Sequence, residues 1–250
     1  MRTLLVGHDH TSRPGFVGEY LRACGHEATR FMVVPEERFD SPSVSVTFPD
    51  PTEWDAVICF GAPWSVYDTD RIDPWITSEL TFLRAAHASE VPVLGICFGA
   101  QALAAALGGG VERAPRTELG WTVIDSDEPE LIPPGPWLES HSDRCILPPD
   151  AREIARTEVG PQAFSIGRSL GLQFHPEATA DLLAEWMAVG GAAHARQIGV
   201  DPDALIAETS TREAVARTEA FRLMDHFLQD FAGRPVPGLD RSPAQVPALE

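Results

Sequence analysis

One cysteine of the chain lies between two glycines, in the segment Gly-Ile-Cys-Phe-Gly at 95–99. The apolar run before it, 91–96, predicts a buried strand, and residues 100–107 predict a helix. Because so sharp a strand-to-helix turn crowds the backbone, both flanks need glycine. The turn would lift the Cys97 sulfur over the helix N-terminus, where free N–H groups favour a thiolate. The pattern predicts a nucleophilic thiol, although a buried cysteine beside a helix-packing Gly-x-x-x-Gly has the same residues.

A reactive thiol needs a base, and the base needs a group that orients it. The best candidate is the segment Gly-Leu-Gln-Phe-His-Pro-Glu at 171–177, a strand that ends in His-Pro-Glu. Residues two apart on an extended segment share a side, so His175 and Glu177 can stand together, and Pro176 helps to end the strand. The alternative is an ordinary solvated loop histidine.

The elements around these residues predict an α/β protein with a mostly parallel central sheet. We expect strands at 3–6, 28–34, 54–60 and 91–96 and helices at 14–24 and 73–89, with a loop at 35–51. This order requires a parallel sheet covered on both faces. Ligands bind such sheets at the carboxyl ends of the strands, where Gly61 and Cys97 both fall.

The second half of the chain has a different pattern. Short strand-like pieces at 120–124, 137–140, 154–157, 162–166 and 170–174 predict an antiparallel or mixed extension of the sheet. Amphipathic helices follow at 182–189 and 212–231, joined by a segment around 201–202. We predict a single domain over 1–232 and a Pro-rich, mobile tail over 233–250.

Composition narrows the partners of the protein. The 250 residues carry a formal net charge of -18 and contain neither lysine nor asparagine, so nucleic acid and anionic membranes are disfavoured and no Walker or Schiff-base lysine is possible. The four cysteines show no C-x-x-C pairing, which argues against a zinc site or a disulfide framework. We therefore expect no metal, no cofactor and no membrane segment, and a cytoplasmic location.

The sequence contains two linked motifs, Gly-Ile-Cys-Phe-Gly-Ala-Gln at 95–101 and Gln-Phe-His-Pro-Glu at 173–177. Together they resemble the class I (triad) glutamine amidotransferases, particularly stand-alone proteins similar to the glutaminase domain of GMP synthase. The resemblance covers about residues 1–180, and the helices to about 231 look like the same subgroup. It implies a flavodoxin-like α/β fold with Cys97 as nucleophile, His175 as general base and then acid, and Glu177 as the residue that orients His175.

The resemblance also implies an oxyanion hole, in which backbone N–H groups hold the negative oxygen of the reaction intermediate. The turn at 61–65 occupies the place of the family's glycine turn and would contribute Gly61 and Ala62, while Phe98 would supply the other donor. Ala62 stands where the family usually has glycine, and a positive φ there would be costly. The alternative is a simple Pro turn.

Four further residues match substrate-binding positions of the family. Gln101, one helical turn after Cys97, matches its glutamine-binding glutamine, the alternative being a surface helix residue. Ser140, His141 and Ser142 resemble the Ser-His-Gly-Asp segment near the α-amino and carboxylate groups of the substrate, with Ser142 in place of the glycine. His141 could equally have a structural role.

The chemistry implied is hydrolysis of the γ-amide of L-glutamine through a Cys97 thioester, giving glutamate and ammonia. Because no ATP site is readable, a separate synthetase subunit would accept the ammonia. Two alternatives stay open. The same triad could serve a γ-glutamyl hydrolase or peptidase, which cleaves a conjugate of a larger amine, or the protein could be a non-catalytic member that binds a partner or metabolite.

Overall fold

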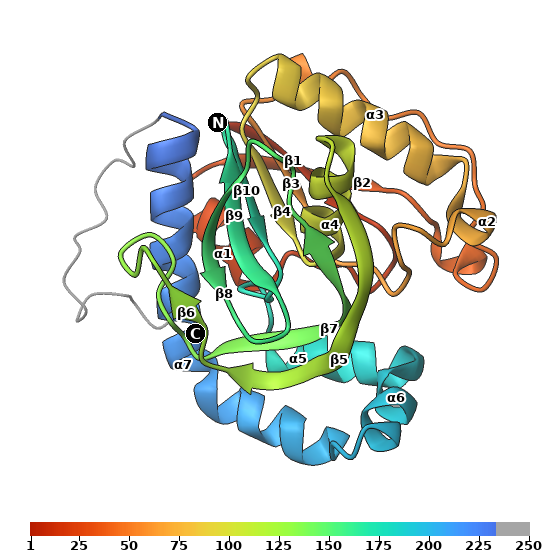
Figure 1. Ribbon diagram of the computed structural model, residues 1–250, viewed down its shortest axis with the longest axis vertical. Helices are drawn as coiled ribbons and strands as arrows, with labels where there is room; N and C mark the ends of the chain where they lie inside the picture. The colour runs from red at the N-terminus through yellow and green to blue at the C-terminus, as the bar shows by residue number, and fades with distance from the viewer. Residues whose placement is uncertain (234–250) are drawn as a thin grey trace.

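The computed structural model describes residues 1–233, which contain a central eight-stranded sheet (Figure 1). Its strand order is β2-β1-β3-β4-β10-β9-β8-β6. The parallel part consists of β2 (Glu27–Met32), β1 (Arg2–Gly7), β3 (Ala56–Cys59), β4 (Val93–Ile96) and β10 (Ser169–Leu172). The antiparallel part adds β9 (Pro161–Ile166), β8 (Arg152–Arg156) and β6 (Asp125–Ser126). The predicted α/β architecture with an antiparallel extension is therefore confirmed.

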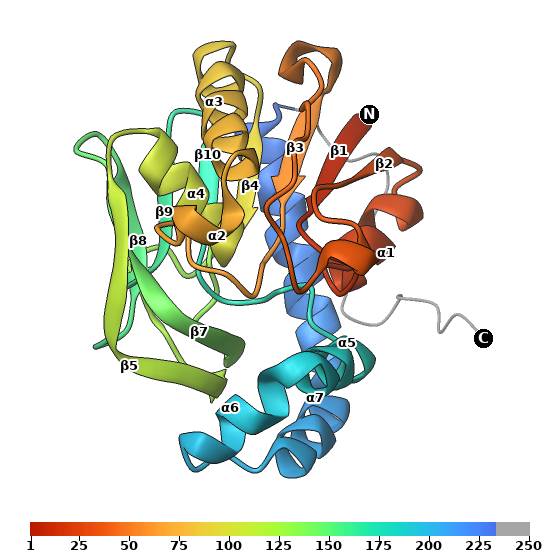
Figure 2. The ribbon, with the colours of Figure 1, turned by 90° about the vertical axis from the view of Figure 1, so that its right-hand side faces the viewer.

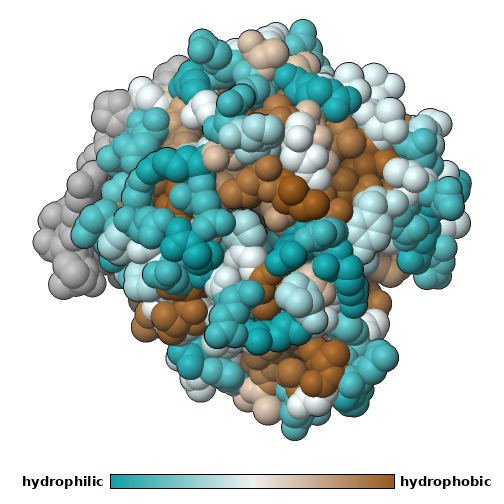
Figure 3. Space-filling model, viewed as in Figure 1, coloured by the Kyte–Doolittle hydropathy of each residue, from teal (hydrophilic) through white to brown (hydrophobic). Residues whose placement is uncertain are grey.

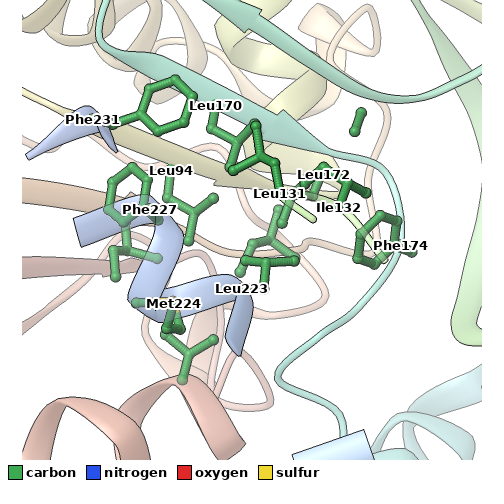
Figure 4. Packing of buried hydrophobic residues seen from close by; sticks show 14 of the residues in the cluster. Leu94, Leu131, Ile132, Leu170, Leu172, Phe174, Leu223, Met224, Phe227 and Phe231 are labelled. Atoms are coloured by element: carbon green, nitrogen blue, oxygen red, sulfur yellow. The ribbon is translucent and has the colours of Figure 1, made fainter. Parts of the chain in front are cut away.

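Helices cover both faces of the parallel strands (Figure 2). Because side chains alternate along a strand, Leu4 and Val6 of β1 belong to one buried cluster and Leu5 to another. The first cluster packs against α3 (Trp75–Ala88) and α4 (Phe98–Ala106). The second packs against α1 (Gly15–Ala23) and α7 (Pro202–His226). Figure 4 shows residues of the second cluster, including Leu94 and Leu170 on the sheet and Leu223 and Phe227 from the C-terminal segment.

The parallel strands end together at one edge of the sheet. Gly95 of β4 is in register with Cys59 of β3 and with Gly171 of β10. The three segments that leave these strands carry Gly61, Cys97 and His175, so the fold gathers residues from distant parts of the sequence at this edge, as predicted.

A second sheet, of two antiparallel strands, is separate from the first in its backbone pairing. It pairs β5 (Gly110–Thr122) with β7 (Trp137–Ile146), with a register shift between Arg113 and Glu118. The prediction that pieces 120–124 and 137–140 extend the main sheet is wrong, because residues 120–122 and 137–140 belong to β5 and β7, which pair with each other. Periodicity identifies a strand, but the choice of partner depends on contacts far apart in sequence.

The C-terminal helices begin earlier than predicted. After α5 (Ala180–Trp186), a π-helical turn at Met187–Gly191 leads into α6 (Ala192–Gln197). The last long helix, α7, starts at Pro202, ten residues before the predicted start, because Asp201 caps it by accepting from the backbone N–H groups of Asp203 and Ala204. A further π-helical turn, Phe227–Phe231, follows α7.

Short helical elements complete the described part: α2 (Thr69–Ile72) and 3-10 turns at Glu36–Arg38 and Pro51–Glu53. None of the helices within residues 1–233 is long and apolar enough to cross a membrane. Figure 3 shows a face on which apolar patches are interspersed with hydrophilic residues. Of the predicted tail at 233–250, all but Gly233 lies outside the described residues.

Candidate active site

Cys97 occupies the sharp turn predicted between strand and helix. Its φ of 52° and ψ of -108° are unusual for a residue other than glycine. A Cβ on Gly95 would lie 2.6 Å from the carbonyl oxygen of Gly99, and one on Gly99 would lie 2.2 Å from that of Cys59. Both glycines are therefore needed, because any larger residue would push the backbone apart.

The thiol lies close to backbone from two neighbouring segments. The N–H of Cys97 donates to the carbonyl of Leu172 at 2.7 Å, and its Sγ lies 4.0 Å from the carbonyl oxygen of Ser140. Phe98 is the first residue of α4, so its N–H has no acceptor within that helix. The sulfur therefore stands beside a helix N-terminus, where negative charge is favoured.

His175 and Glu177 form a buried hydrogen-bonded pair. Nδ1 of His175 donates to Oε1 of Glu177 at 2.8 Å, and the two residues are 5% and 1% exposed. Nε2 of the same ring is buried and has no hydrogen-bond partner among the described residues. A Cβ at Gly61 would lie 3.1 Å from Cε1 of His175 and 3.7 Å from Cβ of Cys97, so the imidazole and the cysteine border one small space.

The surroundings of His175 favour its charged form. Burial lowers the pKa of the imidazole, but the Glu177 carboxylate and the Cys97 sulfur raise it, and the net pKa lies well above its ordinary value. The ring also packs against Trp186, with the ring centroids 4.7 Å apart. Its neighbours thus hold the ring in place and favour its protonated form.

Two cavities adjoin at the thiol. Ala62, Pro63, Cys97, Ser140 and His194 line both of them. One cavity, of about 300 Å³, is bordered by the predicted substrate-binding residues Gln101, Ser140, His141 and Ser142. The other, of about 310 Å³, contains His175 and Glu177 and is partly walled by Trp186 and Val189.

The turn after β3 lies against the same space, as the sequence predicted. Within residues 1–233, Glu90 and Cys97 are the residues other than glycine that have a positive φ, so Ala62 takes an ordinary backbone conformation. The alanine therefore carries no backbone strain. The carbonyl of Gly61 accepts from Ser12 Oγ at 2.9 Å and from His8 Nδ1 at 3.2 Å. No sequence motif pointed to Ser12 or His8, because they reach the turn only through the fold.

Gln101 and Ser142 are both held by the protein itself. Nε2 of Gln101 donates to the carbonyl of Asp143 at 3.3 Å and to Oε1 of Gln173 at 3.2 Å. The hydroxyl of Ser142 lies 2.8 Å from that of Thr117. Gln101 is only 3% exposed, so it is not a surface helix residue. Both side chains border the first cavity in fixed positions.

His141 lies between two buried carboxylates. Its Nδ1 donates to the carbonyl of Asp143 at 2.8 Å, and its Nε2 lies 3.1 Å from Glu118 and 3.2 Å from Glu139. Burial lowers the pKa of His141, but the two carboxylates raise it to about 10. His141, Glu118 and Glu139 are close enough to hold a metal ion. Without a metal ion, the three residues form a buried ion triad in which the imidazolium lies between two carboxylates.

Comparisons with known proteins identify the family of the chain. A family model described as "Glutamine amidotransferase class-I" matches residues 19–185. GMP synthase [glutamine-hydrolyzing] from Thermus thermophilus is 41% identical over 133 residues, which are 49% of this chain and 24% of that protein. The same enzyme from Thermosipho melanesiensis is 36% identical over 133 residues, 50% of this chain and 24% of that protein. The chain thus spans about a quarter of the length of these relatives.

Solved structures share the fold. A glutamine amidotransferase from Thermotoga maritima superimposes with a TM-score of 0.78 at 22% identity, covering 92% of this chain and 98% of that one. Another from Methylobacillus flagellatus gives a TM-score of 0.79 at 22% identity, covering 96% and 98%. At this identity the likeness shows the fold alone.

Proposed function

Because the chain belongs to the class I glutamine amidotransferase family, we propose that it releases ammonia from the γ-amide of L-glutamine, with Cys97 as nucleophile. The observation that carries this proposal is the buried His175–Glu177 pair at 2.8 Å, whose Nε2 is hydrogen-bonded to no other described residue and which shares a cavity with Cys97. An imidazole held in one tautomer by a carboxylate is the arrangement that activates a thiol or hydroxyl nucleophile.

In the first step the Cys97 thiolate attacks the γ-carbonyl carbon. A C–S bond forms, and the carbonyl π electrons move to the oxygen, which accepts hydrogen bonds from the backbone N–H groups of Ala62 and Phe98, with Gly61 shaping the turn. Each such donor is worth about 3 kcal/mol in the transition state. The intermediate collapses, the C–N bond breaks, and the His175 imidazolium protonates the departing nitrogen. A γ-glutamyl thioester and ammonia result.

Water completes the cycle. Now neutral, His175 takes a proton from a water molecule, which attacks the thioester carbon and releases glutamate and the thiolate. Gln101, Ser140, His141 and Ser142 border the cavity of about 300 Å³ that does not include His175. We assign the glutamyl part of the substrate to this cavity, because the leaving nitrogen must lie on the side of the proton donor. The reaction requires neither a metal nor a cofactor.

The acceptor of the ammonia is a separate protein in this proposal. The relatives are named GMP synthase [glutamine-hydrolyzing], and the sequence offers no lysine for an ATP phosphate site. A synthetase subunit that docks near the two cavities would receive the ammonia directly. Because such a subunit would bind the folded chain, a pull-down from the source cells is the way to identify it.

The proposal is tested by measuring glutamate and ammonia formed from L-glutamine. The Cys97→Ala variant should lose this activity, whereas Cys24→Ala, a matched change at a half-buried cysteine outside both cavities, should retain it. Equal rates for the wild-type protein and Cys97→Ala would refute the role of Cys97.

A second candidate is γ-glutamyl hydrolase activity on conjugates of larger amines. The cavity beside His175 favours it, since about 310 Å³ far exceeds the space of a water-sized molecule such as ammonia. Trp186 and Val189 offer apolar contacts to the body of an amine in this cavity. Comparing kcat/KM for L-glutamine with that for γ-glutamyl amides of longer alkyl and aryl amines separates the two candidates. A preference for the larger amides would establish the hydrolase.

A further inference from the structure

A buried ion pair lies directly behind the turn that carries Ala62. His8, which follows β1, and Glu79, on α3, are both 0% exposed. Nε2 of His8 lies 2.9 Å and 3.1 Å from the two carboxylate oxygens of Glu79. Neither residue lines either cavity at the thiol. Burying two charged groups costs free energy, so a pair held this far from solvent calls for an explanation.

Both ring nitrogens of His8 face acceptors. Nδ1 lies 3.2 Å from the carbonyl oxygen of Gly61, while Nε2 faces the Glu79 carboxylate. With Glu79 as a carboxylate, neither acceptor has a proton to donate, so each ring nitrogen carries one and the ring is an imidazolium. The pKa of His8 agrees with this state. Burial lowers it, but Glu79 and the Gly61 carbonyl raise it, and the net shift is upward.

The carbonyl that His8 contacts belongs to the same peptide group as the N–H of Ala62. The Gly61–Ala62 bond is trans, so this N–H points away from the carbonyl oxygen and from the donors on it. The oxygen accepts a second hydrogen bond, from Ser12 Oγ at 2.9 Å. Two donors on one oxygen fix the plane of the peptide. They also draw electron density toward the oxygen, which makes the N–H a stronger donor.

His8 also contacts the second half of the predicted oxyanion hole. Its ring meets the ring of Phe98 edge-on, with the centroids 4.7 Å apart. Phe98 is the residue whose N–H heads α4. One charged side chain therefore packs against Phe98 and hydrogen-bonds the peptide group that contains the Ala62 N–H.

We propose that His8, held by Glu79, acts together with Ser12 as a positioning group that orients and polarises the Ala62 N–H of the oxyanion hole. This inference rests on the proposed acyl-transfer function. It adds His8 and Glu79, which line neither cavity, and Ser12, which borders the cavity beside His175. Because the negative oxygen exists only in the transition state and the intermediate, these residues affect the chemical step and not the binding of the substrate.

The test uses Ser12→Ala, which removes one donor to the Gly61 carbonyl, and Glu79→Gln, which keeps the shape of the pair but removes the charge that holds His8 protonated. We expect kcat for L-glutamine to fall about tenfold in each, less than the 100- to 1000-fold typical for loss of an oxyanion donor itself, with KM nearly unchanged. Ser41→Ala, at an exposed serine, is the matched control and should behave as the wild-type protein.

A second readout separates positioning from general damage to the site. Alkylation of Cys97 by iodoacetamide is a displacement that forms no oxyanion, so its rate reports only the thiolate and its accessibility. We expect this rate to stay the same in both variants. If Glu79→Gln does not fold, Ser12→Ala alone is used for the test, because it leaves the His8–Glu79 ion pair intact.

Three results would overturn the inference. Unchanged kcat in Ser12→Ala would do so, and so would an equal loss of iodoacetamide reactivity, which would mean that the variant disturbs Cys97. In both cases an active wild-type protein would leave the proposed function standing. A wild-type protein that turns over neither L-glutamine nor other γ-glutamyl amides would overturn the proposed function and this inference together.

Discussion

Nδ1 of His175 donates to Oε1 of Glu177 at 2.8 Å, although only Pro176 separates the two residues in the chain. The contact fixes the tautomer of the imidazole, so its Nε2 is the atom left for chemistry. The carboxylate also contributes to a His175 pKa well above the ordinary value. If the imidazolium is the acid that releases the leaving group, activity depends on keeping that proton.

The first prediction is a change in the pH profile of Glu177→Gln. Activity needs protonated His175, so kcat/KM declines on the alkaline side as this proton is lost. Removing the carboxylate lowers the pKa of His175, and the alkaline decline should therefore move to lower pH. We also expect kcat to fall roughly 10²- to 10⁴-fold, because the tautomer is no longer fixed. An alkaline limb at the same pH in both proteins would argue against this role of Glu177.

The second prediction concerns the glycine that follows the cysteine. Gly99→Ala would bring a Cβ within 2.2 Å of the Cys59 carbonyl oxygen. We expect the free energy of unfolding to fall by about 3 kcal/mol and the activity to be lost. The control is Gly110→Ala, whose added Cβ would meet only ordinary contacts at 3.7 Å and 3.9 Å and should change stability by less than about 1 kcal/mol. Urea unfolding of both variants makes the comparison.

The third prediction links His141 to the pH dependence of stability. Its pKa rises from 6.5 to about 10 on folding. The folded protein thus binds an extra proton between these values, so this contribution to stability is complete below about pH 6.5 and disappears as the pH rises through about 10. The wild-type protein should lose more stability than His141→Gln over that range. The free energy of unfolding is measured with urea at several pH values. If it changes equally with pH in the two proteins, the buried imidazolium is contradicted.

The fourth prediction uses the cavity beside His175. Val189→Trp places a large ring where Val189 lines that cavity. If the cavity holds the leaving amine, kcat/KM for γ-glutamyl amides of bulky amines should fall at least about tenfold, with little effect on L-glutamine. Val215→Trp, at an exposed position of α7 outside both cavities, should change neither. Equal effects of the two substitutions would show that the cavity does not select the leaving group.

Much of the fold could be predicted from local sequence. The apolar run before Cys97 and the two glycines around it predicted a strand and a sharp turn, because that turn depends on neighbouring residues alone. Asp201 and Pro202 carried the signal for the start of α7. The sequence prediction starts this helix later, and residues 208–213, Glu-Thr-Ser-Thr-Arg-Glu, contain no apolar residue that would continue the periodicity.

The pairing of strands that are distant in sequence could not be predicted from local sequence patterns. Nothing local distinguishes the strand pieces within β5 and β7 from those that join the main sheet, since the difference lies in the partner strand. Likewise, His8 and Glu79 are 71 residues apart, and neither belongs to a motif. Local motifs and the family resemblance both predict the cysteine, the histidine and the carboxylate, whereas the groups that hold the Gly61–Ala62 peptide are visible only in the contacts of the folded chain.

The most direct test of the account is the mass of the protein quenched with acid shortly after it is mixed with L-glutamine, followed by mapping of any adduct to a peptide. We predict a γ-glutamyl group bound as a thioester to Cys97, which disappears as glutamate forms. Continuing release of ammonia with the γ-glutamyl group on another residue, or with no covalent adduct at any time and no effect of Cys97→Ala, would contradict the account.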